Sequence, residues 1–163
     1  MTIPTNREHL DDGSGAGSRV RGIAQEVING AGTTKQLLVG ESGALCIFGD
    51  AAGQIYNLPV IGDNDVGMYF EFGVTITGTS NSYTINTGSA ANFIGGGIFA
   101  SSTTAGDGDF FPADISSDVA MTLNADVDGR LLGANFTYTA VSSTEWYCGG
   151  FTVSVPVALT PFS

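Results

Sequence analysis

The sequence predicts an all-β fold: an antiparallel β-sandwich or barrel of about 8–10 short strands, preceded by an extended N-terminal arm. Three observations lead to this prediction. Short runs rich in apolar, β-branched and aromatic residues recur along most of the 163 residues. Residues that favour turns separate these runs, and several runs alternate between apolar and polar side chains, which is typical of strands with one buried face.

The arm is predicted to comprise residues 1–34. Its GSGAGS run at 13–18 has a composition typical of flexible linkers and offers little apolar surface to bury. Further along, Val20, Ile23, Val27 and Ile28 fit one face of a short helix weakly, and an extended strand no better. Such a segment is expected to order when it meets a neighbouring surface.

The β domain is predicted to span residues 35–163. Its expected strands are, in order, 36–40, 44–50, 54–60, 67–76, 82–88, 92–100, 119–124, 131–141, 144–150 and 151–157. Within these runs, Phe70 and Phe72 are expected to point to one face and Phe151 and Val153 likewise. The GGG at 95–97 predicts a bulge or a close approach of backbones rather than a nucleotide-binding loop.

Residues 100–118 form the longest segment without a predicted strand. Loops of this length are usually functional or interface elements. The segment carries Phe110 and Phe111. They are expected either to plug one end of the sandwich or to contact a partner.

The distribution of charge is more informative than the net charge of −11. Acidic and basic residues balance in the first 35 positions, whereas Arg130 is the only basic residue among the remaining positions, which hold twelve acids. An acidic body repels nucleic-acid phosphates and anionic membranes, so neither is an expected partner. With no apolar N-terminal stretch and no run of about 20 apolar residues, a cytoplasmic origin is expected.

No catalytic constellation is visible, so we expect a protein that is not an enzyme and uses no cofactor. His9, the only histidine, lies in the arm, where it could not be held against a nucleophile or a metal ion. Cys46 and Cys148 fall in strand-like runs and are expected to be buried thiols.

Acidic pairs at 107 and 109 and at 126 and 128 lie in turn-like segments and are expected to be solvated. Asn124–Gly129 matches the first half of a calcium loop, but the expected twelfth ligand is Asn135 instead of a glutamate. A hairpin turn is the simpler interpretation, and a bound cation remains the alternative.

The order of motifs in the body resembles a family of bacteriophage capsid decoration (cement) proteins. The matching stretches are LLVGESGALCIFGDAAGQIYNLP at 37–59, GMYFEF at 67–72, SNSYTINTG at 80–88, FIGGGIF at 93–99 and TEWYCGG at 144–150. The arm and the 100–118 loop are not part of the likeness.

This resemblance implies a structural virion protein, made in the host cytoplasm and placed on the outer capsid surface. It would bridge neighbouring major capsid proteins, and it would often be a homotrimer. The residues expected to contact a partner are Arg7, Arg19, Val20, Arg21, Ile23, Val27, Ile28, Lys35, Phe110 and Phe111.

The alternative is a receptor- or glycan-binding module of a phage tail fibre. In that case Trp146, Tyr147, Tyr56, Tyr69 and Tyr83 would present stacking faces for sugars. Core packing is the competing interpretation for Trp146, because it lies in an alternating run.

Overall fold

The structure is a computed structural model that describes residues 25–30, 34–102, 108–124, 132–154 and 161–163. Within these ranges it contains one 3₁₀ helix, η1 (Val39–Glu41), and no helix long and apolar enough to cross a membrane. The strands are β1 (Val27–Asn29), β2 (Thr34–Gln36), β3 (Leu45–Phe48), β4 (Gln54–Asn57), β5 (Tyr69–Val74), β6 (Tyr83–Asn86), β7 (Phe93–Ser102), β8 (Gly108–Pro112), β9 (Ala120–Leu123), β10 (Asn135–Ala140) and β11 (Glu145–Ser154).

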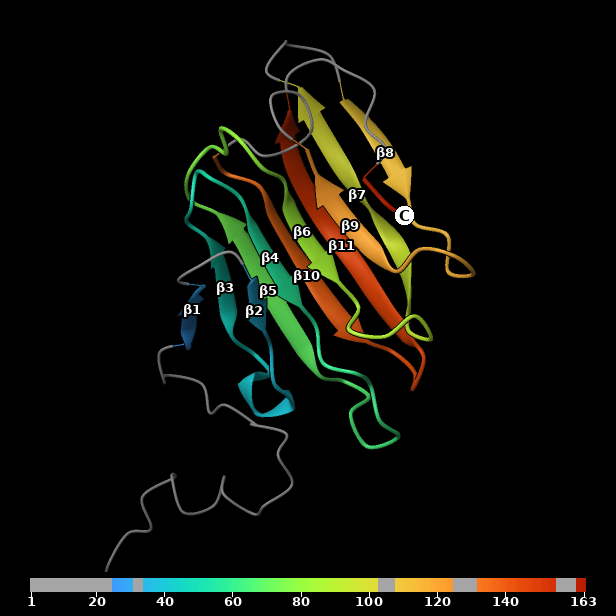
Figure 1. The fold of residues 1–163 in the computed structure, drawn as a ribbon. Coiled ribbons are helices and arrows are strands. Elements are labelled where there is room, and N and C mark those ends of the chain that lie inside the picture. Colours follow the sequence, from blue (N-terminus) through green and yellow to red (C-terminus); the bar gives the residue numbers. More distant parts are fainter. Residues whose placement is uncertain (1–24, 31–33, 103–107, 125–131, 155–160) are drawn as a thin grey trace, which may run out of the picture.

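The strands form two sheets packed face to face, which confirms the predicted all-β sandwich (Figure 1). The larger sheet has seven strands in the order β1-β3-β5-β10-β11-β7-β8, and the smaller has four in the order β2-β4-β6-β9. Beside β9, a bridge joins Met121 to Phe162, so the last residues extend the smaller sheet.

The pairing is mixed, so the purely antiparallel pattern expected from the sequence is wrong in this respect. From β1 to β7 the chain passes from one sheet to the other at every step, which makes β1, β3 and β5 parallel neighbours in one layer and β2, β4 and β6 parallel neighbours in the other. The turns between these runs therefore connect the two layers. Hairpins join only β7 to β8 and β10 to β11 among the described strands.

The core is a cluster of aromatic side chains contributed by both sheets. Phe48 of the larger sheet lies with its ring centroid 4.8 Å from that of Tyr83 and 5.1 Å from that of Tyr56, both from the smaller sheet. Phe70 and Phe72 are fully buried, as their alternation predicts. Aromatic rings bring a large apolar area out of water, so this cluster is a principal source of stability.

Four regions differ from the sequence prediction. β1 and β8 lie in segments expected to be arm and loop. The strand expected at 36–40 is wrong, since β2 ends at Gln36 and Val39–Glu41 forms η1. Residues 144–157, expected as two strands, contain the single long strand β11. Within β11 the face is also reversed, since Thr152 is buried and Phe151 is exposed. The strand keeps one alternation from Trp146 onward, so Gly149 and Gly150 do not shift it as a turn would.

Candidate interaction surface

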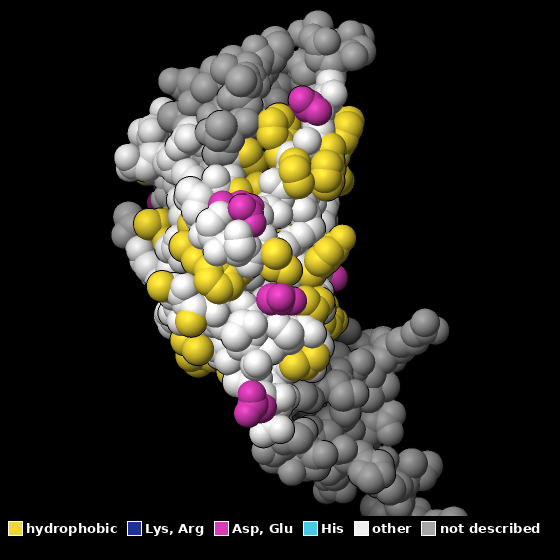
Figure 2. Space-filling view, turned by 90° about the vertical axis from the view of Figure 1, so that its right-hand side faces the viewer, with side chains coloured by type: hydrophobic (Ala, Val, Ile, Leu, Met, Phe, Trp, Pro, Cys, Tyr) yellow, Lys and Arg dark blue, Asp and Glu magenta, His cyan; other side chains and the backbone are white. Residues whose placement is uncertain are grey.

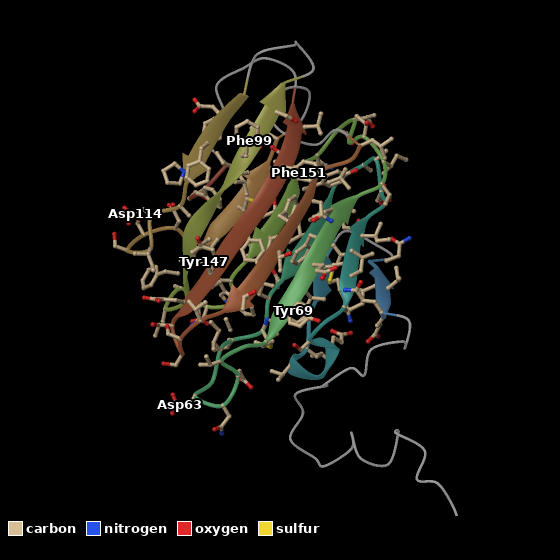
Figure 3. The ribbon with its side chains drawn as sticks, turned by 180° about the vertical axis from the view of Figure 1, so that it is seen from behind. Asp63, Tyr69, Phe99, Asp114, Tyr147 and Phe151 are labelled. Carbon is tan, nitrogen blue, oxygen red and sulfur yellow. The ribbon has the colours of Figure 1, made fainter. Side chains whose placement is uncertain are left out.

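The outer face of the larger sheet carries a row of exposed phenylalanines. Phe110 on β8 lies opposite Phe99 on β7, and Phe99 lies opposite Phe151 on β11. Their side chains are 56%, 48% and 45% exposed, respectively. We call these three residues the aromatic row. Figure 3 shows Phe99 and Phe151 on adjacent strands of this face.

Gly149 leaves the surface beside the aromatic row open. Gly149 lies between Tyr147 and Phe151 on the same strand, and a Cβ added to it would meet no atom within 4 Å. Tyr147 is 56% exposed and stands on the same face (Figure 3). The bare backbone at Gly149 is therefore flanked along the strand by two exposed aromatic side chains.

Gly96 on β7, which lies opposite Cys148 on β11, is required by the backbone geometry. Gly96 has φ +86°, and a Cβ there would lie 2.2 Å from the carbonyl oxygen of Cys148. The expectation that the GGG run marks a close backbone approach is thereby confirmed. The close approach permits the continuous pairing of β7 with β11, which places Phe99 opposite Phe151.

The described charges on this face are acidic. Glu71 on β5 and Glu145 on β11 both point outward, since their sequence neighbours point into the core. Lys35, the one basic residue among the described positions, lies on the smaller sheet and bonds Glu41 at 2.8 Å. Figure 2, which views the molecule from its β8 side, shows hydrophobic side chains beside acidic ones and no lysine or arginine among those coloured.

The structure describes five of the ten predicted contact residues. Phe110 and Val27 are exposed, Phe111 packs partly against the core, and Lys35 is paired with Glu41. The fifth, Ile28, is discussed below. The remaining five lie outside the described residues: Arg7, Arg19, Val20, Arg21 and Ile23.

Ile28 belongs to the chain's own core, which corrects its expected role as a partner contact. Its side chain is only 8% exposed, and β1 pairs in parallel with β3. The next residue but one, Gly30, donates its N–H to the Tyr56 hydroxyl at 3.1 Å. Residues 25–30 therefore form part of the β body, and of the predicted arm only residues 1–24 precede it.

The side chains considered for sugar stacking separate into two groups. Trp146, Tyr56 and Tyr83 are fully buried, so they cannot present a ring face to a ligand. Tyr69 and Tyr147 are exposed and lie on the outer face of the larger sheet (Figure 3). The predicted core position of Trp146 is confirmed.

The two cysteines are free buried thiols, as expected. Burial raises the pKa of both Cys46 and Cys148 to about 12, so neither is a thiolate near neutral pH. No group of three or more metal-binding side chains occurs in the part of the chain that the structure covers. His9 and most of Asn124–Gly129 lie outside that part.

A hollow of about 390 Å³ lies on the smaller sheet. Its amide side chains, from Gln36, Asn57 and Asn86, stand in register on three parallel strands. The Asn86 amide donates to the Asn57 side chain at 2.8 Å, and Gln36 donates to backbone carbonyls of neighbouring residues. The two asparagines bond each other and Gln36 bonds the backbone, so these hydrogen bonds link the strands and account for the amides without a ligand.

Comparison with known proteins adds no family to this description. No protein-family model matches the chain, and neither a curated protein nor a solved structure matches it.

Proposed function

We propose that this chain is a structural virion protein that decorates and stabilises a phage capsid by bridging neighbouring major capsid proteins, and that it acts as a trimer. The observation that carries the proposal is the aromatic row on the outer face of the larger sheet. A contiguous group of exposed aromatic side chains is typical of a protein–protein contact surface.

The rest of the body supports an adhesive role. The row is built on three hydrogen-bonded strands, so its side chains are held by a rigid scaffold rather than by a loop. The resemblance to decoration proteins supplies the capsid as the partner. Many copies on one shell would allow modest individual contacts to give firm attachment.

The tail-fibre alternative has less support, because only Tyr69 and Tyr147 of its five proposed stacking residues are exposed. These two stand on the same sheet, separated by β10. A glycan array would test this alternative directly. Specific glycan binding that is lost on Tyr147→Ser would favour the tail-fibre function over capsid decoration.

The capsid proposal is tested by adding the purified full chain to phage particles assembled without it and sedimenting the particles. We expect saturable binding at a copy number set by the shell symmetry, and a higher temperature of genome release. A variant carrying Phe99→Ser, Phe110→Ser and Phe151→Ser should bind at least about tenfold more weakly, because it loses most of the apolar contact area.

The matched control replaces apolar side chains that are equally exposed elsewhere. Val60 and Val66, between β4 and β5, are 58% and 54% exposed, and a Val60→Ser, Val66→Ser variant should bind as the wild type does. If the wild-type chain fails to sediment with particles, or if the aromatic variant binds as well as the control, the proposal is wrong.

A further inference from the structure

The outer face that carries the aromatic row also carries two carboxylates. Glu71 stands in register with Gly149 through Thr137 on β10, two strand spacings or about 10 Å away, and its carboxylate accepts the side-chain amide of Gln25 at 3.1 Å. Glu145 lies six residues before Phe151 on β11, and the described residues place no lysine or arginine on this face. A second copy of the same face would bring like charges together, which is unfavourable. An occupant with apolar and basic side chains would instead match both the rings and the carboxylates.

The chain itself contains such a segment. Of its five basic residues, Lys35 is paired with Glu41, and three others, Arg7, Arg19 and Arg21, precede the described body. The stretch RVRGI at 19–23 alternates arginine with apolar residues. A guanidinium group can stack on an aromatic ring and also bond a carboxylate, so this stretch has the chemistry that the face requires.

The reach of the chain favours a neighbouring copy over the same molecule. The body begins at Gln25, whose side-chain amide bonds the Gly43 carbonyl at 2.9 Å beside β1. Arg21 is four residues earlier and can extend about 13 Å from it, and Arg19 about 20 Å. The row begins at Phe151 on β11, four strand spacings or about 19 Å from β1, and continues to β7 at about 24 Å and β8 at about 29 Å. On its own molecule the backbone of the segment therefore reaches no further than the β11 end of the row, whereas a segment from a neighbouring copy can lie along all of it.

We propose that the arginine-bearing segment 19–23 of one copy docks on the aromatic row of a neighbouring copy. Gly149 leaves open space above the backbone between Tyr147 and Phe151, where a planar side chain fits against a ring. The contact joins two different surfaces, so it is heterologous, and repeating it closes a ring when the rotation between copies permits. A ring of three would account for the expected trimer.

This inference deepens the proposed function by naming the occupant of the row, but the association is a property of the chain alone. It is therefore tested without capsids, by analytical ultracentrifugation of full-length variants. The segment variant carries Arg19→Ser, Arg21→Ser and Ile23→Ser. The face variant is the triple phenylalanine replacement described above. Each alone should associate at least about tenfold more weakly than the wild type.

Mixing the two variants gives the decisive measurement. The segment variant keeps an intact face, and the face variant keeps an intact segment. If the contact is heterologous, one molecule of each variant should form a dimer through that single contact. The dimer should not grow further, because the remaining face and the remaining segment are both defective. The Val60→Ser, Val66→Ser control should associate as the wild type does. Association of the wild type should weaken as salt rises, because charged groups take part.

Three results would overturn the inference. These are a wild-type chain that stays monomeric at every concentration, a segment variant that associates like the wild type, and a mixture that remains monomeric although both variants keep native Trp146 fluorescence. If the triple replacement does not fold, Phe151→Ser alone serves as the face variant. Capsid binding with no self-association would refute this inference and leave the proposed function standing.

Discussion

Two core tyrosines are equally buried, but only one of them has a hydrogen-bonded hydroxyl, and this difference offers a test of the structure. Tyr56 and Tyr138 are both fully buried. The Tyr56 hydroxyl accepts the N–H of Gly30 at 3.1 Å and the side-chain amide of Gln54 at 3.0 Å, and it lies 2.8 Å from the Ile47 carbonyl oxygen, to which it donates. The Tyr138 hydroxyl has no hydrogen-bond partner.

Burial raises the pKa of Tyr138 well above its usual value, and the Cys148 thiol close to its hydroxyl adds to this effect. The pair does not reach ordinary hydrogen-bond geometry, and a thiol is a weak partner in any case.

Replacing each tyrosine by phenylalanine should therefore have opposite consequences. Tyr56→Phe leaves the partly buried Gly30 N–H without an acceptor and removes the bond to Ile47, which should cost about 2–4 kcal/mol of unfolding free energy. Gln54 keeps its bond to the Gly30 carbonyl, which limits the loss. Tyr138→Phe removes a hydroxyl that is buried without compensation, so stability should be unchanged or rise by about 1 kcal/mol.

Urea unfolding followed by tryptophan fluorescence measures the difference. Trp146 is the only tryptophan and is fully buried, so its emission reports the packing of the core. For a chain of this length, a loss of about 3 kcal/mol corresponds to a melting temperature lower by about 6–12 °C. Equal losses for the two variants, or a larger loss for Tyr138→Phe, would refute the hydrogen-bond assignment.

Two further predictions concern glycine and cysteine positions. Gly96→Ala should destabilise the fold by about 2–5 kcal/mol because of its positive φ and the 2.2 Å approach to the Cys148 carbonyl, whereas Gly149→Ala, with open space around it, should stay within about 0.5 kcal/mol in the same melt. The thiols of Cys46 and Cys148 should react with an alkylating reagent at neutral pH only on unfolding; rapid labelling of the native chain would contradict their burial. Because the pKa of each thiol is about 12 in the folded state against 9.0 ordinarily, the unfolded state ionises first. The thiols' contribution to the unfolding free energy should therefore be constant below pH 9 and fall between pH 9 and 12, and a rise in stability over this range would contradict the assignment.

Local patterns in the sequence were sufficient to predict the layers but not the connections between them. Alternation identified Phe70 and Phe72 as core residues, and the two thiols were predicted to be buried. The same patterns cannot show whether a turn forms a hairpin or crosses to the other sheet, because both use the same turn residues. Parallel pairing of β1, β3 and β5 was missed for this reason.

Of the candidate surface, the sequence predicted Phe110 as a partner contact and Tyr147 as a stacking residue of the tail-fibre alternative. Phe151 was expected to be buried, since a period of two identifies two faces without saying which one meets the core. Phe99 carried no signal of its own within an apolar run. The glycines on the same strand face, such as Gly97 and Gly149, are a signal that could have been used. Glycine has no side chain to fill a core, so a strand face rich in glycine is better suited to the outside of the sheet.

The alternating passage of the chain between the layers also has a consequence for how the molecule folds. Every parallel neighbour in β1 to β6 is separated in the chain by a strand of the opposite sheet, so a pair cannot form before a longer loop has closed. The chain therefore loses conformational entropy on closing several loops before the favourable contacts between the strands can form. We therefore expect slow folding for a chain of this size, with the two sheets appearing together rather than one after the other.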